Sequence, residues 1–266
     1  MISALVLTFN EEIILDKCLK SLKFVDEIVV FDSYSTDKTV EIAKNNNARV
    51  IQREFDNYAA QRNAALKSIS SDFEWVLMVD SDEIVSSELK SEILDLTKTQ
   101  KEVHMFRCRR KDMFQDKWIK YSSGYPTWFP RLFKNGKVIV EREINEEYKT
   151  DGKISNLQGH LIHYPFNKGL NWWFSKHNIY SEMESSKMLE EISTPIKISA
   201  MFSKDPVIRR KFQKRLSYHI PFRPTFVFLV FYVFNLGFLD GLAGYNFCRM
   251  RFIYESMIDI KFKSKK

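Results

Sequence analysis

Glycine-rich phosphate-binding loops are missing from this chain of 266 residues. It holds only eight glycines, and neither Gly-x-Gly-x-x-Gly nor Gly-x-x-x-x-Gly-Lys occurs. These loops hold phosphates on backbone N–H groups in dinucleotide-binding and P-loop proteins, so their absence argues against both classes. A nucleotide bound by this protein would have to be held by side chains and a metal ion.

Cysteine is also scarce, and the three that occur, Cys18, Cys108 and Cys248, are widely spaced. An odd and scattered set argues against a disulfide framework and against a cysteine-built metal site. A reducing compartment fits this pattern best. Residues 1–7 lack the basic region of a secretory signal and read as a strand, so we expect the amino terminus to be part of the fold.

The formal net charge of +7 is unevenly distributed along the chain. Basic clusters at 209–215 and 261–266 suggest contact with an anionic surface, either lipid headgroups or nucleic acid. Between them, residues 225–239 are apolar apart from Asn235 and Gly237. The run is shorter than the roughly 20 residues that span a bilayer, so we expect a helix that lies in or dips into the membrane interface.

Two other interpretations of this region remain. The apolar segment could be a helix buried against the rest of the protein or against a partner subunit. The basic composition could serve nucleic-acid binding, but base stacking needs exposed aromatic rings on a basic platform, and the aromatic residues of 225–239 have no charges between them. We therefore expect an anionic membrane surface as partner, and no nucleic acid.

The first hundred residues or so alternate between strand-like and helix-like segments. Strand, crossover helix and strand in this order predict a parallel sheet, and right-handed crossovers bring the carboxyl ends of its strands to one edge. The expected strands are 2–9, 27–31, 48–52 and 75–79, and the expected helices are 11–22, 40–44, 57–69 and 87–97.

Shorter strand-like pieces follow, which predict a mixed sheet added to the parallel one. Asn135-Gly136 lies between two of them and is a strong hairpin signal. Residues 171–189 have helical composition. The shorter strands are expected at 103–107, 128–133, 138–141 and 161–164.

Three carboxylates follow the apolar run at 75–79: Asp80, Asp82 and Glu83. A buried strand of this kind places them at its carboxyl end, where open α/β sheets bind ligands. Close carboxylates raise one another's pKa unless a cation compensates, which favours a divalent metal that carries a phosphorylated ligand. A solvated turn before a helix is the alternative, because Asp and Ser also favour turns and caps.

The residues that follow the expected strands resemble those of the inverting glycosyltransferases of family 2, whose nucleotide-sugar domain has the GT-A fold. The likeness lies in Thr8-Phe9-Asn10-Glu11-Glu12, in Asp32-Ser33-Tyr34-Ser35-Thr36-Asp37 and in Asp80-Ser81-Asp82-Glu83, in the same order and spacing. A branch that adds glucose or a related sugar to the lipopolysaccharide inner core is similar through Gln61-Arg62-Asn63, Arg131-Leu132-Phe133 and Phe238-Leu239-Asp240-Gly241.

The resemblance implies a fold and a domain arrangement. The fold would be α/β of GT-A type, a Rossmann-like and mostly parallel sheet with helices on both faces, plus a small mixed sheet and a helical C-terminal extension. Residues 1–165 would form the nucleotide-sugar-binding and catalytic domain. Residues 166–266 would form the helical region, with a membrane-associating segment at about 206–266.

The resemblance also implies roles for single residues. Asp82 would bind Mg²⁺ or Mn²⁺, and His163 would complete the metal shell. The catalytic base would be Glu146, with Glu143 second, although Asn145 occupies the position where the family often shows His, and an acidic surface loop is the alternative. The donor-binding residues would be Thr8, Asn10, Glu11, Asp32, Arg62 and Asp80. His160, Arg131 and Lys176 are weaker candidates for contacts with metal or phosphate.

By the same resemblance, the reaction would be direct displacement at the anomeric carbon of a nucleoside diphosphate sugar. The donor used most often in this family is UDP-glucose. The acceptor would be a lipid-linked saccharide such as the lipopolysaccharide or lipooligosaccharide core, or else a polyprenyl phosphate or capsule intermediate. The protein would be peripheral on the cytoplasmic face of the inner membrane. A phosphohydrolase with an Asp nucleophile is a remoter alternative, because Asp80-Ser81-Asp82 is followed by Glu83-Ile84 and not by the threonine that its motif needs.

Overall fold

The computed structural model describes residues 1–141, 147–195 and 198–265. The chain divides into two compact units, each described here by itself. Unit 1 consists of Met1–Lys111 and Phe129–Asn167, and unit 2 of Asp112–Trp128 and Lys168–Lys266. The short segment 112–128 thus leaves unit 1 and belongs with the C-terminal residues.

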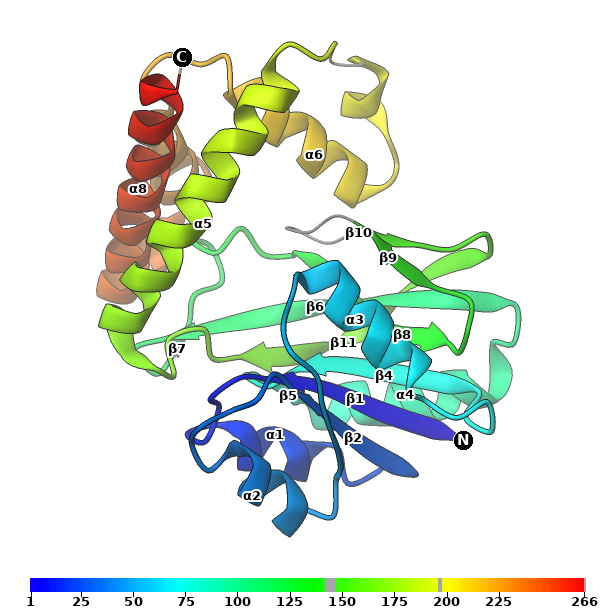
Figure 1. Ribbon diagram of the computed structural model, residues 1–266. Helices are drawn as coiled ribbons and strands as arrows, with labels where there is room; N and C mark the ends of the chain where they lie inside the picture. The colour runs from blue at the N-terminus through cyan, green and yellow to red at the C-terminus, as the bar shows by residue number, and fades with distance from the viewer. Residues whose placement is uncertain (142–146, 196–197, 266) are drawn as a thin grey trace. The chain divides into compact units, whose positions relative to one another are not determined.

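Unit 1 is built on a large sheet whose first part is parallel, as the alternating sequence predicts (Figure 1). Its strands run in the order β3-β2-β1-β4, and every neighbouring pair is parallel. The connections are helical, and the Asn57 side chain caps the third helix by accepting from Ala60 N. These elements are β1 (Ile2–Thr8), α1 (Leu15–Ser21), β2 (Glu27–Asp32), α2 (Thr39–Asn45), β3 (Arg49–Gln52), α3 (Tyr58–Lys67) and β4 (Trp75–Asp80).

Both faces of this sheet are buried, because successive side chains of a strand point to opposite sides. On one face, Val6 and Val79 share a core with α1, α2 and α4 (Ser87–Thr99). On the other, Leu5 and Met78 share a core with α3. Figure 1 accordingly shows α3 in front of the sheet and α4 behind it. Strands buried on both sides need continuous apolar runs, and these were the runs visible in the sequence.

The later strands join the same sheet and make it mixed. They extend the order to β3-β2-β1-β4-β8-β6-β11-β5, and the end of β6 pairs with β7 inside the segment 112–128 of unit 2. The pairs β4·β8 and β11·β5 are antiparallel. The predicted fold class, an α/β sheet of GT-A type with helices on both faces, is confirmed. The added strands are β5 (Glu83–Val85), β6 (Val103–Phe114), β7 (Lys117–Trp118), β8 (Trp128–Lys134) and β11 (Lys153–His163).

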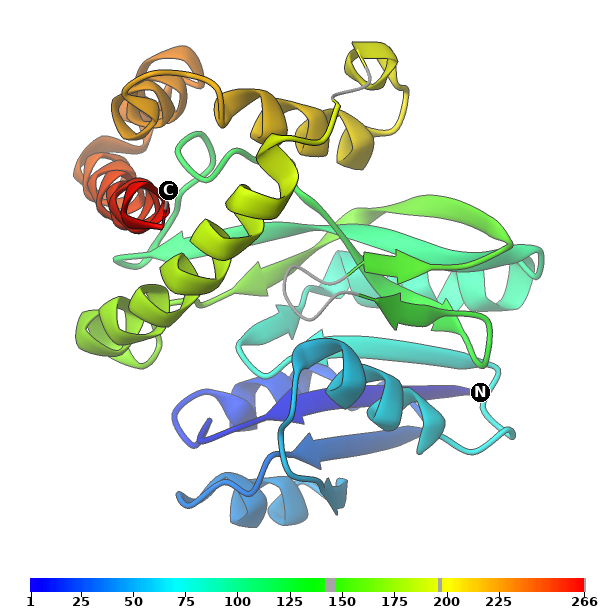
Figure 2. The ribbon, with the colours of Figure 1, turned by 45° about the horizontal axis from the view of Figure 1, so that its top comes forward.

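The hairpin predicted around Asn135-Gly136 is wrong in its pairing. The turn forms, with Gly136 at φ +69°, but β9 (Ile139–Glu141) pairs with β10 (Glu147–Lys149) in a separate two-stranded ribbon (Figure 2). The Asn63 side chain of α3 explains the separation, because it accepts from Val140 N at 2.9 Å and donates to Val140 O at 2.7 Å. These bonds hold β9 on α3 and not on β8.

Unit 2 is helical apart from the segment 112–128. Its two longest helices, α5 (Gly169–Ile192) and α8 (Gly241–Ser264), lie side by side in Figures 1 and 2 and share an apolar cluster that includes Met188 and Ile258. The remaining elements are η1 (Ile198–Phe202), α6 (Pro206–Ser217), α7 (Arg223–Leu229), η2 (Val230–Phe234) and η3 (Gly237–Asp240).

The basic residues at the end of α8 are engaged within unit 2. Lys261 Nζ lies 2.8 Å from Asn178 Oδ1, and Lys265 Nζ lies 2.7 Å from a Glu182 carboxylate oxygen, so both ammonium groups bind α5. Lys263 pairs with Asp259 on its own helix at 2.8 Å. This cluster therefore has an internal role, which the charge count of the sequence did not reveal.

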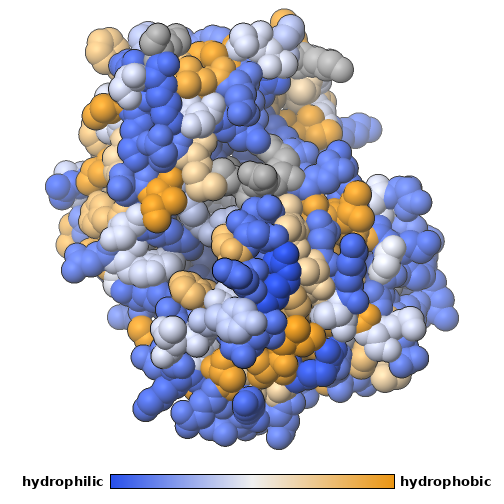
Figure 3. All heavy atoms as spheres, in the orientation of Figure 1, coloured by the Kyte–Doolittle hydropathy of each residue, from blue (hydrophilic) through white to orange (hydrophobic). Residues whose placement is uncertain are grey.

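The apolar run at 225–239 forms α7, η2 and the start of η3. In the described part of the chain no single helix is long and apolar enough to cross a bilayer. The segments Arg223–Phe234 and Gly237–Ser264, bent by 70° at their junction, meet that test only as a pair, by length and composition. Hydrophobic residues lie among hydrophilic ones along the left edge of Figure 3, where Figure 1 places α8.

Candidate functional site

The three carboxylates after β4 differ sharply in their surroundings. Glu83 is fully buried and forms a two-point ion pair with Arg131 of β8, from Nε to Oε2 at 2.9 Å and from Nη2 to Oε1 at 2.8 Å. Asp80 accepts from Arg131 Nη2 and, at 2.9 Å, from Arg62 Nη2 of α3. For Asp80 and Glu83, two of the three acids, the compensating positive charges are therefore those of Arg62 and Arg131.

These arginines decide the charge of Asp80. Burial disfavours ionisation of its carboxyl group, but Arg131 and Arg62 outweigh burial and hold the pKa of Asp80 well below its usual range. Arg62 and Arg131 are themselves almost fully buried, at 8% and 4% exposure. Arg62, which was predicted to hold the nucleotide, thus contacts Asp80 directly. Arg131, which was considered as a phosphate ligand, binds Asp80 and Glu83 instead.

Asp82 has a different partner, His163. β11 pairs antiparallel with β5 so that His163 stands opposite Glu83, and Tyr164 N donates to the Asp82 carbonyl oxygen at 2.9 Å. His163 Nε2 then lies 3.3 Å from Asp82 Oδ2. Burial opposes ionisation of Asp82, yet His163 outweighs it and lowers the pKa of this carboxyl group. The two residues predicted as metal ligands are thus brought together from positions far apart in the chain.

The residues present fit a hard divalent cation that shares its coordination with phosphate. Within the described ranges no group of three or more Asp, Glu, His or Cys is arranged to hold a metal ion. Asp82 and His163 supply one carboxylate and one imidazole, and the Asp82 side chain retains 25% exposure. Mg²⁺ is commonly bound by only one or two carboxylates together with substrate phosphates. The pair could hold such an ion only with a phosphorylated ligand present.

His160 does not share this site. It lies an odd number of residues before His163 on β11, so its side chain points to the opposite face of the strand. Burial, Arg109 and Lys111 lower the pKa of His160. Lys176 belongs to unit 2, where its ammonium lies 4.6 Å from the centre of the Trp172 ring.

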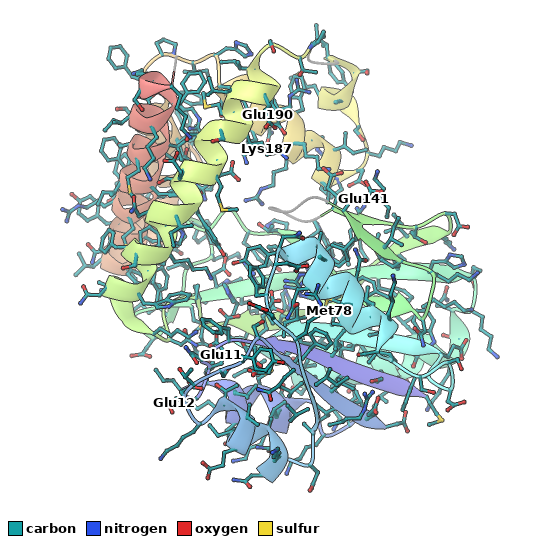
Figure 4. All side chains as sticks on the ribbon, in the orientation of Figure 1. Glu11, Glu12, Met78, Glu141, Lys187 and Glu190 are labelled. Atoms are coloured by element: carbon teal, nitrogen blue, oxygen red, sulfur yellow. The ribbon has the colours of Figure 1, made fainter. Side chains whose placement is uncertain are left out.

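The loop after β1 is fastened to the loop after β2. Asn10 has a left-handed backbone, with φ +54°; its side-chain oxygen accepts from Thr36 N at 2.8 Å, and its own N–H donates to Ser35 Oγ at 2.9 Å. Glu11 N donates to Thr39 Oγ1 at 2.7 Å. Figure 4 shows Glu11 beyond the carboxyl end of β1. The backbone near the expected nucleoside position is therefore fixed before any ligand binds.

Asp32 is held entirely by protein donors. It is fully buried; Thr8 Oγ1 donates to Oδ1 at 2.9 Å, and Ser35 Oγ donates to the same oxygen. Ser35 N and Gln52 Nε2 donate to Oδ2 at 2.8 and 3.1 Å. Four bonds fill the roughly four acceptor positions of a carboxylate. A contact from Asp32 to a nucleobase stays a prediction, and it requires one of these donors to move.

The predicted bases Glu146 and Glu143 lie outside the described residues. The residues on either side of them are placed: Glu141 and Glu147 stand opposite each other in the β9–β10 ribbon, and Figure 4 shows Glu141 at the end of β9. Tyr148 stacks on Phe133, with ring centres 5.2 Å apart. Together with the bonds of Asn63, this stacking fixes the ribbon from which the segment departs.

The sequence predicted no role for some residues of this site. Asn63 and Gln61 stood beside Arg62 in a quoted motif, and Gln61 is buried with its amide donating to Ser33 Oγ at 3.0 Å. Glu83 was recognised as part of the acidic cluster, but no role was predicted for it. Consecutive residues of a helix point in different directions. This spacing indicates that Gln61, Arg62 and Asn63 each have a separate partner.

A mostly parallel α/β sheet whose carboxyl edge gathers Asn10, Asp32, Asp80 and Asp82 is the arrangement of a GT-A type fold. The chain belongs to the family described as glycosyl transferase family 2, whose model matches residues 3–151. An uncharacterized glycosyltransferase of Rickettsia typhi is 41% identical over 205 residues, which cover 71% of this chain and 68% of the relative. The protein is therefore an enzyme, a glycosyltransferase.

A relative from Rhizobium meliloti extends the likeness to most of the chain. It is the lipopolysaccharide core biosynthesis glycosyltransferase LpsC, 25% identical over 253 residues that cover 92% of this chain and 85% of LpsC.

Solved structures also align with the chain. Residues 1–349 of TarS from S. aureus align with 99% of this chain and 90% of that one, at 18% identity and a TM-score of 0.46. A glucosyl-3-phosphoglycerate synthase from Mycobacterium tuberculosis, in complex with Mn²⁺ and UDP, aligns with 41% of this chain and 44% of that one, at 24% identity and a TM-score of 0.37.

Proposed function

We propose that this glycosyltransferase is metal-dependent and inverting, and that it moves a sugar from a nucleoside diphosphate sugar, UDP-glucose as the first candidate, to a lipid-linked saccharide. The observation that carries the proposal is the pairing of Asp82 with His163 at 3.3 Å, beside an Asp80 already neutralised by arginines. Of the acids after β4, Asp82 is the one paired with an imidazole instead of an arginine, and a neutral imidazole can join it as a metal ligand. Membership of family 2 supports the donor class.

Each part of the site has a task in this reaction. A bound Mg²⁺ or Mn²⁺ would neutralise the charge of the departing diphosphate. Asp82 and His163 would hold that ion, and Asp80, fixed by two arginines, would orient the ribose of the donor. The backbone joined by Asn10 and Thr36 would shape the nucleoside pocket. Glu146, or Glu143, would remove the proton of the acceptor hydroxyl group.

We assign the acceptor to the lipopolysaccharide or lipooligosaccharide core. Support comes from LpsC, which is similar over most of this chain. Further support comes from unit 2, where Phe222 and Phe234 are 84% and 74% exposed in an apolar segment. Exposed rings of this kind favour binding to a membrane interface. The enzyme would thus be peripheral, on the cytoplasmic face of the inner membrane.

The test compares two substitutions of aspartate in unit 1. Asp82→Asn removes the charge of the proposed ligand, and Asp95→Asn, at an exposed position of α4, is the matched control. Thermal unfolding is measured with UDP and other nucleoside diphosphates, with and without Mn²⁺. We expect one diphosphate with Mn²⁺ to raise the unfolding temperature of the control and not of Asp82→Asn.

A second measurement follows the products. UDP-glucose is supplied with a purified lipopolysaccharide core acceptor, and the transferred sugar is detected by mass. Release of free phosphate without any acceptor would support a phosphohydrolase instead. Unchanged transfer by Asp82→Asn would refute the metal assignment.

A further inference from the structure

Asp240, which stands in the motif Phe238-Leu239-Asp240-Gly241, binds a turn more than a hundred residues earlier in the chain. Its carboxylate accepts from three successive backbone N–H groups, those of Lys120, Tyr121 and Ser122, at 3.2, 2.9 and 2.8 Å. Ser122 Oγ adds a fourth bond at 2.7 Å. These bonds, all inside unit 2, fix the turn against η3 and give the turn a single conformation.

The fixed turn forms one side of a pocket. The pocket has a volume of about 340 Å³ and is lined by Lys120, Tyr121, Gly124, Tyr125 and Asn235. Gly124 has φ +74°, and a Cβ there would lie 2.7 Å from the Phe231 ring, so the close approach of η2 to the turn requires glycine. The turn and η2 are therefore in close contact, which holds this side of the pocket in place.

The polar groups of this pocket have capacity for a ligand. Lys120 Nζ lies 5.7 and 5.3 Å from the ring centres of Trp118 and Tyr121, and within the described residues it forms no ion pair. The side-chain amide of Asn235 likewise makes no hydrogen bond inside the described part of unit 2. An ammonium, an amide and tyrosine rings together suit a sugar ring that carries an anionic group.

The surroundings of the pocket are apolar. Asn235 is flanked by Phe234 and Leu236, which are 74% and 44% exposed, and Leu239 is 55% exposed nearby in the chain. A polar pocket whose lining residue Asn235 stands between exposed apolar neighbours in the chain matches a ligand with a charged head and acyl chains. Free sugar phosphates would use the pocket alone and leave these side chains in water, so their binding would lack the hydrophobic contribution that acyl chains supply.

We propose that this pocket binds the phosphorylated sugar headgroup of the lipid-linked acceptor, with Lys120 on the phosphate, Asn235 on the sugar hydroxyls, and the acyl chains on Phe234 and Leu239. The inference rests on the proposed function, since it names where the lipid-linked acceptor is recognised. It assigns the segment 112–128 a binding role that the names of the family and of the relatives do not contain.

The experiment is flotation of the full-length protein with phosphatidylcholine vesicles. One set contains lipid A, a lipid with a phosphorylated disaccharide head, and the other contains phosphatidylglycerol at equal charge. We expect tighter binding to lipid A. Lys120→Gln and Asn235→Ala should each reduce that binding about tenfold, the size expected when a charge-assisted or buried hydrogen bond is lost. Lys117→Gln, at an exposed position of the neighbouring β7, is the control and should bind as the wild type does.

Two outcomes would overturn the proposal: equal binding to the two vesicle types, or lipid A binding by Lys120→Gln that matches Lys117→Gln. Tight binding of free glucose 1-phosphate without any vesicle binding would overturn the lipid-linked source. Thermal stabilisation by the donor nucleotide with Mn²⁺ is measured on every variant. This stabilisation reports on the donor site alone. If the wild type shows no stabilisation, the proposed function is refuted, whereas the vesicle results test the pocket.

Discussion

Arg131 forms with Glu83 the most buried ion pair that unit 1 shows among its described residues: both side chains are under 5% exposed, and two of their hydrogen bonds measure 2.8 and 2.9 Å. Glu83 also accepts from Asp80 N at 3.0 Å. The pair therefore connects β5, β8 and the end of β4. Desolvation of both charges is costly, so the pair is stable only while each partner is present.

Removal of Arg131 should be severe. We expect Arg131→Met to lower the free energy of unfolding by about 3–5 kcal/mol, because it leaves the fully buried Glu83 and the partly exposed Asp80 with too little positive charge. Glu83→Gln combined with Arg131→Met should recover part of this loss. Urea unfolding of the four proteins of this double-mutant cycle measures the coupling, which should exceed about 1 kcal/mol. Additive effects would contradict the finding that the two residues act as a unit.

Asn63 supports the ribbon that leads to the predicted bases. Asn63→Ala removes two bonds to Val140 and should cost about 1–3 kcal/mol, since both backbone groups of Val140 lose their partner. We also expect a lower kcat, because β9 and β10, the strands on either side of the predicted bases Glu143 and Glu146, would lose their anchor on α3. Lys67→Ala, on the same helix with an exposed side chain, is the control. A loss of stability with unchanged kcat would separate the ribbon from catalysis.

The sequence predicted the sheet edge well and its internal contacts poorly. Apolar runs and the right-handed crossover rule place Asp32, Asp80 and Asp82 at one edge without knowledge of packing. The partners of these acids depend on tertiary distance: Arg131 comes from β8 and His163 from β11, and no period in the sequence relates them to β4. For the same reason the strong Asn135-Gly136 signal gave the turn but not the strand that pairs with β9.

Metal affinity should depend on His163 and not on His160. We expect His163→Gln to raise the Mn²⁺ concentration needed for half-maximal activity by about tenfold or more, because an imidazole ligand is replaced by a weaker one. His160→Gln, on the opposite face of β11, should leave it unchanged. The measurement is a metal titration of transfer at saturating donor. A shift in both variants would point to a disturbance of β11 and not to a ligand.

His177 of α5 should make stability depend on pH. Its ring stacks on Trp173 with centres 3.7 Å apart, and burial lowers the pKa of His177 to about 4 from an ordinary 6.5. Burial outweighs the hydrogen bond between Nδ1 and Trp173 O, at 2.8 Å, which favours the charged form. The folded protein therefore keeps a neutral imidazole at pH values where the unfolded chain binds a proton.

The sign follows from proton binding. Above pH 6.5 neither state is protonated at this residue, and the full stability is present; between about 6.5 and 4 the unfolded state takes up a proton first, so stability falls as pH falls. We expect a loss of about 1–2 kcal/mol after allowance for solvent screening of a part-exposed ring. His177→Phe keeps the stack and cannot titrate, so its urea unfolding should lose less stability over this range, whereas His219→Gln, at an exposed position, should follow the wild type. Parallel curves for His177→Phe and the wild type would show that the ring is not protected from protonation in the folded state.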